Sequence, residues 1–394
     1  MIYLDNAGTT KVSKSVKKAM LPYLDKVFGN ASSLHNVGQI AKEHLEKARE
    51  DVAKCINAKP EEIYFTSGGS ESDNWAIEGI ARWGQKQGKM HIITSAFEHH
   101  AVLNTIKEKE KQGFKITYLP VYENGIIKIE DLKKAITKET CLVSIMFANN
   151  EIGTIQPVKE IGEICRKAGV VFHTDAVQAV GHIKVDVVEQ NIDMLSISGH
   201  KFHGPKGVGV LYCNKKTPLF SFINGGAQER GRRAGTENIA SIVGLSVALK
   251  NAIKEMKKVA KKEQQQRDRL FCELRKIEHS KINGDLSSRL PNNFNMSFEG
   301  IEGESLLLLL NDKGICASSG SACTSGSLDP SHVLLAIGLP HEIAHGSLRL
   351  TLSKYTTNRG IEKTIKIVPK IVSYLRSISP VWDKLEKGEI KHAI

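Results

Sequence analysis

The sequence predicts an α/β protein with a mostly parallel sheet in a large domain and a smaller α+β domain. Short apolar runs alternate with helical stretches between about residues 38 and 213, and this alternation is typical of βαβ units. Several apolar runs end in notable polar residues, at the position where open α/β sheets bind ligands. Beyond a long helical stretch the pattern changes to short strands mixed with helices.

Each expected element of the first region has its own signal. Apolar residues return at helical spacing over about 38–57, 70–87 and 157–168, and the last stretch has Pro157 at its start. The expected strands are short apolar runs at 63–66, 92–95, 142–147, 170–173, 193–197 and 208–213.

The later region divides the chain into two expected domains. A stretch rich in Lys, Glu and Gln runs from about Ile239 to Ile277, and we place the domain change within it, near residue 260. The large domain would then be 16–259, and the small domain would combine 1–15 with 260–394. Within the small domain we expect strands at 294–298, 314–317 and 347–352 and helices at 304–311 and 361–385.

Bulk composition limits the classes of function. The net charge of +12 would attract acidic partners, but no nucleic-acid-binding motif is present, and much of the excess lies on one expected helix, so a solvated face is favoured. No signal peptide follows Met1, and the apolar run 306–310 is far too short to span a membrane. Seven dispersed cysteines, without a C-x-x-C pair or zinc spacing, favour a cytoplasmic location.

Lys201 is the first candidate catalytic residue. It follows an apolar strand in a turn of small residues, and partial desolvation there favours the neutral amine. A neutral lysine can condense with an aldehyde such as that of pyridoxal phosphate (PLP). Ser198 and His200 flank Lys201 with donors for a phosphate. A basic hairpin with solvated lysines is the alternative, and it would be preferred if this motif stood alone.

A second group of candidates follows other strands. Residues 63–71 form a strand, a glycine turn and a helix start, which would direct backbone N–H groups of Gly69 and Ser70 at an anion, although Ser70 also suits a plain helix cap. Asp175 could keep a pyridine nitrogen protonated, and Gln178 could donate to the ring hydroxyl. For Asp175 alone, a helix cap is the usual alternative.

Histidine and arginine candidates remain ambiguous. His99 follows a strand, where an imidazole can stack on a ring and transfer protons, but the sequence does not rank it against His100. Arg349 faces away from its neighbours Leu348 and Leu350 on an alternating strand, so its guanidinium could bind a carboxylate or form a surface salt bridge. No acidic or cysteine ligand recurs at metal-ligand spacing, and no metal site is predicted.

Cys323 differs from the other cysteines because it lies in a loop of Ser, Gly, Ala and Thr, at about 318–330. Such a loop is expected to be mobile and to expose the thiol. Cys323 is therefore either a nucleophile or a harmless surface cysteine. The other cysteines lie in expected helices or at strands and are interpreted as small core residues or bystanders: Cys55, Cys141, Cys165, Cys213, Cys272 and Cys316.

Together these motifs resemble the NifS/IscS-type cysteine desulfurases over nearly the whole chain. The long Ser/Gly loop around Cys323 is similar to the NifS/IscS branch rather than the SufS-like branch. Gly8, and Gly69 with Ser70, depart conservatively from the Ala and Ala-Thr that are common in the family. The matching segments are Tyr3–Asn6, Phe65–Asn74, Glu98–His99, Asn149–Gly153, His173–Gln178, Ser198–Gly207, Gly231–Thr236 and Ser318–Ser325.

The resemblance implies an aspartate-aminotransferase-like, PLP-dependent fold and a homodimer with its active sites at the subunit interface. Lys201 would bind the cofactor aldehyde covalently, and Cys323 would be the nucleophile. Asp175 would bind the ring nitrogen and Gln178 the ring oxygen, while His99 would stack on the ring and transfer protons. Arg349 would bind the substrate carboxylate, and Asn150 would contact cofactor and substrate. The residues that would bind the phosphate are Gly69, Ser70, Ser198, His200 and Thr236 of the partner subunit.

The implied reaction converts L-cysteine to L-alanine. The Cys323 thiolate would attack the substrate sulfur, and the resulting persulfide would pass its sulfur to an iron–sulfur scaffold protein of the IscU/NifU type. The alternatives are another PLP enzyme of the same fold, either an aminotransferase or a selenocysteine lyase, and a non-catalytic basic binding module. The two enzymes would not need Cys323.

Overall fold

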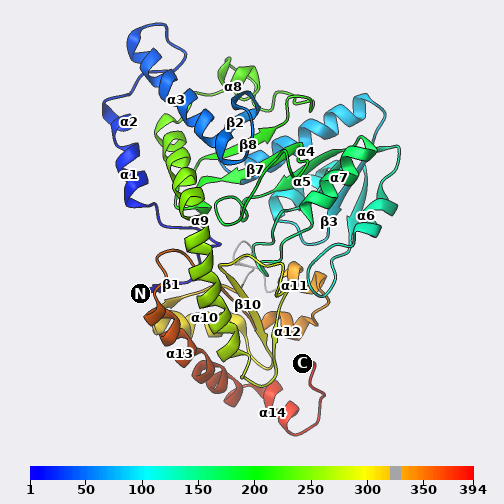
Figure 1. Ribbon diagram of the computed structural model, residues 1–394. Coiled ribbons are helices and arrows are strands. Elements are labelled where there is room, and N and C mark those ends of the chain that lie inside the picture. Colours follow the sequence, from blue (N-terminus) through cyan, green and yellow to red (C-terminus); the bar gives the residue numbers. More distant parts are fainter. Residues whose placement is uncertain (320–329) are drawn as a thin grey trace.

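A seven-stranded sheet forms the centre of the larger part of the molecule (Figure 1). The structure is a computed structural model that describes residues 1–319 and 330–394. The strand order is β2-β8-β7-β6-β5-β3-β4. Only β8 of this described sheet runs antiparallel to its neighbours, which confirms the prediction of a mostly parallel sheet. The strands are β2 (Ile63–Thr66), β3 (His91–Ser95), β4 (Lys115–Leu119), β5 (Thr140–Ser144), β6 (Val171–Asp175), β7 (Met194–Ser198) and β8 (Gly209–Cys213).

The central strands are apolar on both faces because helices cover both. Side chains alternate along a strand, so Val143 and Leu195 enter the core on one face while their neighbours Leu142 and Met194 enter the core on the other. The first face packs against α3 (Asn36–Cys55), α7 (Val158–Ala168) and the start of α9 (Ile239–Leu274), and the second against α4 (Gly69–Lys86) and α5 (His100–Lys111). The short elements of this part are α1 (Lys14–Met20), α2 (Pro22–Asp25), η1 (Pro60–Glu62), α6 (Ile129–Ala135), η2 (Gly199–Lys201) and α8 (Gln228–Gly231).

One strand is shorter than the sequence predicts. The expected run 142–147 leaves the regular ladder after Ser144. The N–H groups of Ile145 and Phe147 still donate to β6 carbonyls, at 3.2 and 2.8 Å, so the backbone stays extended beside β6 as it approaches the cavity described below.

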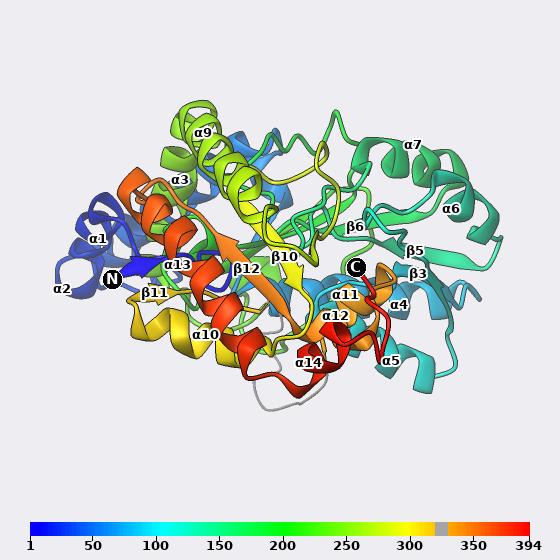
Figure 2. The same cartoon turned by 90° about the horizontal axis from the view of Figure 1, so that it is seen from below.

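A three-stranded antiparallel sheet, in the order β12-β10-β9, forms the smaller part. Figure 2 shows α10 and α13 beside it. The expected helix 361–385 is two helices, since Pro380 begins a new one. The elements are β9 (Ser280–Ile282), β10 (Asn293–Phe298), β12 (Ser347–Thr351), the parallel pair β1 (Ile2–Tyr3) and β11 (Ile315–Cys316), and the helices α10 (Gly303–Asp312), α11 (His332–Ala336), α12 (His341–His345), α13 (Asn358–Ser377) and α14 (Pro380–Glu386).

The helix α9 joins the two parts (Figure 1). Leu245 and Leu249 lie in the core of the seven-stranded sheet, whereas Leu270 and Leu274 lie in the core of the small sheet. The expected domain limits, with a change near residue 260, remain a prediction, because the helix continues through that point. None of the described helices is long and apolar enough to cross a membrane.

Candidate functional site

The carboxyl ends of the parallel strands bring polar residues to one cavity of about 270 Å³. Asp175 ends β6, and Ser198 ends β7 just before Lys201. His99 follows β3, and Gly69 follows β2 after a glycine turn. Since parallel strands end at the same edge of a sheet, residues far apart in the sequence meet there.

Almost all of the predicted site residues line this cavity. Thr236 does not; it is exposed, and its expected role on the phosphate of a partner subunit remains a prediction. Cys323 lies outside the described residues. The lining residues are Ala7, Gly8, Gly69, Ser70, Asp73, His99, Met146, Ala148, Asn150, Asp175, Val177, Gln178, Ser198, His200, Lys201 and Arg349.

The N-terminal segment lies across the lysine turn. The Lys201 amine donates to the main-chain oxygens of Ala7 at 2.6 Å and Gly8 at 2.9 Å. Thr10 Oγ1 donates to the carbonyl of His200 at 2.7 Å and fixes the same turn. The hairpin alternative was right about the antiparallel β7–β8 pair, but Lys201 lines the cavity and is not a solvated surface lysine. The contacts with Ala7 and Gly8 were not predicted, because main-chain acceptors have no side-chain signature.

Two buried carboxyl groups lie at the floor of the cavity. Asp175 is 6% exposed, and its Oδ1 accepts a hydrogen bond from the Val177 N–H at 2.9 Å. Burial raises the pKa of Asp175, while His99 and Lys201 oppose that rise. Burial, and then the neighbouring Asp175, raise the pKa of Asp73 well above its ordinary value. A protonated Asp73 beside Asp175 avoids two neighbouring buried negative charges. Asp73 was missed because its place in a first helical turn has an ordinary explanation.

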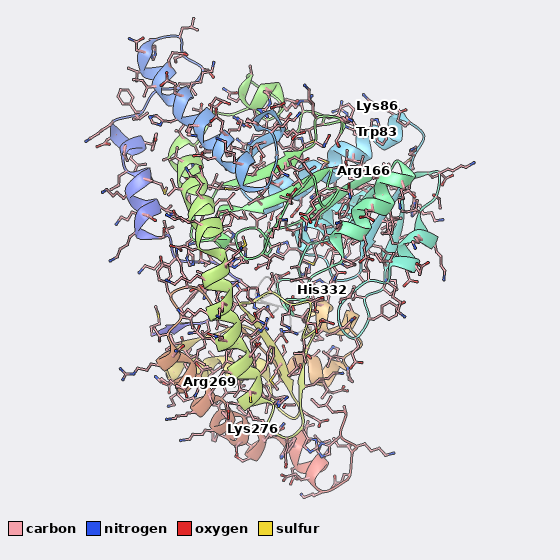
Figure 3. The ribbon with its side chains drawn as sticks, in the orientation of Figure 1. Trp83, Lys86, Arg166, Arg269, Lys276 and His332 are labelled. Atoms are coloured by element: carbon pink, nitrogen blue, oxygen red, sulfur yellow. The ribbon has the colours of Figure 1, made fainter. Side chains whose placement is uncertain are left out.

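His99, and not His100, lines the cavity. It caps α5, and its Nδ1 accepts a hydrogen bond from the Ala101 N–H at 3.1 Å. Burial lowers the pKa of His99, which keeps its imidazole neutral near pH 7. His100 instead lies against His332 of α11, with ring centroids 4.7 Å apart. Figure 3 shows His332 where the two parts of the molecule meet, and its Nε2 is 3.0 Å from the carbonyl oxygen of Glu98.

Arg349 reaches the cavity from the small sheet. Leu348 and Leu350 on either side are buried in the small core, so the alternation predicted for this strand is confirmed. Arg349 Nη2 forms an ion pair with Asp5 Oδ1 at 2.8 Å, and Nη1 donates to the carbonyl oxygen of Asn150 at 3.1 Å. The predicted alternative of a salt bridge is thus also present, although the Arg349 side chain is only 2% exposed. No sequence pattern predicted a role for Asp5.

The start of α4 lies at the cavity, where the sequence predicts an anion cradle. Gly68 is the cap residue, so Ser70 lies in the first helical turn and is not the cap. A Cβ added to Gly69 would lie 2.7 Å from Val177 Cγ2, which leaves no room for a larger residue without a shift. The backbone N–H groups of a helix start favour an anion. Side-chain donors that line the same cavity are Ser70, Ser198 and His200.

The cysteines of the described residues are free thiols. Burial raises the pKa of Cys55 and of Cys141 to about 11, and that of Cys213 to about 12. These groups stay protonated near neutral pH, so they are poor nucleophiles. This agrees with their interpretation as structural residues.

Comparisons with known proteins extend over nearly the whole chain. The Aminotransferase class-V family model matches residues 2–364. A cysteine desulfurase IscS of Clostridium botulinum is 53% identical over 98% of both chains, and one of Methanosarcina thermophila is 54% identical over 97% of this chain and 95% of its own.

The solved structures agree with these relatives. A NifS-like protein superposes with a TM-score of 0.90 at 40% identity, covering 95% of this chain and 100% of its own. A NifS-like protein from Rickettsia africae superposes with a TM-score of 0.86 at 30% identity, covering 95% and 99%. They confirm the predicted PLP-dependent transferase fold class. The chain belongs to the aminotransferase class-V family and, within it, to the cysteine desulfurases of the NifS/IscS type.

Proposed function

We propose that this protein converts L-cysteine to L-alanine with PLP as cofactor and passes the released sulfur through Cys323 to an acceptor. One observation carries the proposal. The amine of Lys201, the buried carboxyl group of Asp175 and the guanidinium of Arg349 meet in one cavity although they come from two different sheets. An amine, an acid and a carboxylate receptor are the groups that an amino-acid-converting PLP enzyme needs.

The donors around the cavity fit PLP. The α4 start would hold the phosphate with Ser198, His200 and Thr236 of the partner subunit. Asp175 would face the ring nitrogen. Gln178, whose Nε2 donates to the Ala7 carbonyl at 3.1 Å, would face the ring oxygen. Bound PLP supplies an aldehyde for the lysine amine and a conjugated ring that accepts electrons from the substrate carbon.

Each side chain of the cavity has a separate role in the proposed reaction. Arg349 orients the substrate carboxylate, exchanging its ion pair with Asp5 for one with the substrate. Asn150 lies beside it and contacts cofactor and substrate. His99, neutral because burial lowers its pKa, stacks on the ring and accepts or returns a proton at an imidazole nitrogen. Asp175 holds a proton at the ring nitrogen from a site that water reaches poorly.

The sulfur passes from one thiol to another. The Cys323 thiolate attacks the sulfur of L-cysteine, the carbon–sulfur bond breaks, and a proton replaces sulfur on the carbon. The products are alanine and a persulfide on Cys323, so atoms balance with no added oxidant. We further propose an iron–sulfur scaffold of the IscU/NifU type as acceptor, a homodimer, and a cytoplasmic location.

The test incubates the full chain, loaded with PLP, with L-cysteine and measures alanine and sulfide. Cys323→Ser should abolish both products, whereas Cys272→Ser, at an exposed position on α9, should leave them unchanged. An aminotransferase or a selenocysteine lyase would keep its turnover in Cys323→Ser. Undiminished alanine release in that variant would therefore refute the proposal in favour of these alternatives.

A further inference from the structure

Two histidines and a glutamate from distant segments converge in the smaller part of the molecule. His279 precedes β9, Glu299 follows β10, and His392 lies beyond α14. One ligand atom from each of the three side chains lies within 4.8 Å of the other two. Sequence spacing could not reveal this group, because the fold alone brings the three segments together.

The distances suit one bound ion. Glu299 Oε2 lies 2.8 Å from His392 Nδ1 and 3.5 Å from His279 Nδ1. The main-chain oxygen of Ile394 lies 2.9 Å from His279 Nδ1 and adds a fourth atom. Tetrahedral Zn²⁺ with bonds of about 2.0–2.2 Å places its ligand atoms roughly 3.3 Å apart. The three distances above, from 2.8 to 3.5 Å, lie near this separation.

The surroundings hold the ligands in place. Glu299 is 5% exposed, and its side-chain ion pairs within the described residues are with histidines. Arg376 donates to the main-chain oxygens of both Glu299 and His279, at 3.0 and 2.9 Å, and so fixes the backbone of two ligands. Trp382 packs edge-on against both imidazoles, with ring centroids 5.5 and 5.6 Å away. Supporting groups of this kind are what a metal site needs beyond its ligands.

We propose that His279, Glu299 and His392, with the Ile394 oxygen, bind one divalent transition-metal ion of the Zn²⁺ class. Imidazole ligands favour Zn²⁺, Ni²⁺ or Cu²⁺ over Mg²⁺ or Ca²⁺. The two rings lie nearly parallel, 17° apart with centroids at 3.7 Å. A nitrogen lone pair lies in its ring plane, so one ring tilts on binding, and His392 on the C-terminal segment is free of any helix or strand. The ion would cross-link this segment to the end of β10.

The test titrates the PLP-loaded full chain, treated first with EDTA, with ZnCl₂ by calorimetry and with NiCl₂ by Trp382 fluorescence. Wild type should bind one Zn²⁺ at this site, and Ni²⁺ should quench a component that Trp382→Phe lacks. His392→Ala and Glu299→Gln should each weaken Zn²⁺ binding by at least about tenfold and remove the quenching. Alanine formation from cysteine should stay unchanged in His392→Ala.

A matched control tests whether Zn²⁺ or Ni²⁺ binds at a second pair of histidines instead. His341 and His345 lie one turn apart on α12 with ring centroids 4.8 Å apart, so His341→Ala removes that pair and should leave the Trp382 quenching intact. The proposal is overturned if wild type shows no saturable Zn²⁺ binding up to about 1 mM, or if His392→Ala and Glu299→Gln bind as wild type does. Either result would leave a hydrogen-bonded cluster without a metal.

Discussion

The two sheets contribute to the cavity in different ways. The seven-stranded sheet supplies residues from the ends of its strands, such as Asp175 and Ser198, whereas the small antiparallel sheet supplies Arg349 from the middle of β12. In the seven-stranded sheet the residues that line the cavity lie at strand ends or just after them, whereas a polar residue further back, such as His173, is fully buried and bonded to the neighbouring strands. A strand with one face on a core can place a polar residue at any alternate position. The position of a residue along its strand therefore predicts a site only once the kind of sheet is known.

The largest expected effect is at Lys201, which follows the end of β7 in the seven-stranded sheet. Lys201→Ala removes the amine that binds the cofactor aldehyde and should lower alanine formation by at least about a thousandfold. Borohydride reduction followed by mass spectrometry should find the pyridoxyl group on wild-type Lys201 and none in the variant. Lys206→Ala, in the same loop but exposed, should retain activity. An adduct at another lysine would contradict the assignment.

A second prediction concerns the support of the edge strand that leads to the anion cradle. Arg49 forms a buried two-point ion pair with Glu229, whose Oε2 also accepts from the Phe65 N–H of β2 at 2.9 Å. Arg49→Met leaves a buried carboxylate without its cation, so the free energy of unfolding in urea should fall by about 3–5 kcal/mol. Lys47→Ala removes an exposed lysine that pairs with Glu50 and Asp51 and should cost less than about 1 kcal/mol. Equal losses in both variants would contradict the importance of burial.

Substitutions of Arg349 and its neighbour Leu350 test the contribution of the middle of β12. Arg349→Lys loses the forked contact with a carboxylate, so the KM for L-cysteine should rise by roughly 10- to 100-fold. Turnover of cysteamine, which lacks the carboxylate, should change little. Leu350→Ala should instead lower stability by about 2–5 kcal/mol and leave the KM unchanged. A similar KM rise in both variants would show that the two faces of β12 are not functionally distinct.

The last prediction is a pH dependence of stability. Burial raises the pKa of Glu98 to about 8, against about 4.3 in an unfolded chain. Between these values the folded state binds the proton more tightly, so stability falls as pH rises, by at most about 1.4 kcal/mol per pH unit. Glu98→Gln removes this dependence, so its urea stability should improve relative to wild type from pH 5 to pH 8. Glu108→Gln, exposed on α5, should keep a constant difference. A constant difference for Glu98→Gln as well would contradict the raised pKa.

The strand that ends at Asp175 and the strand that precedes Lys201 were predictable from sequence, because a buried parallel strand is a short apolar run that ends in a polar residue. The order of the strands was not predictable. Of the seven strands in the large sheet, β8 is the last in sequence, yet it lies between β2 and β7. No local sequence pattern encodes a pairing between strands so far apart in the chain.

The unpredicted parts of the site depend on features that no short sequence pattern determines. A shift of one residue at the start of α5 decides between His99 and His100, and helix starts are poorly fixed by sequence. Asp5 and Asp73 escaped notice because each acts through another residue, Arg349 or Asp175. The role predicted for Thr236 involves a second subunit, and it stays a prediction.

The continuous helix α9 has a mechanical consequence. It runs without a break from the core of the seven-stranded sheet to the core of the small sheet, so its length helps to set the distance between Lys201 and Arg349. Each residue added to a helix advances it by 1.5 Å and turns it by about 100°. The distance between these two groups therefore depends on the number of residues in α9. A single residue inserted in its middle turns would shift and rotate one half of the cavity relative to the other.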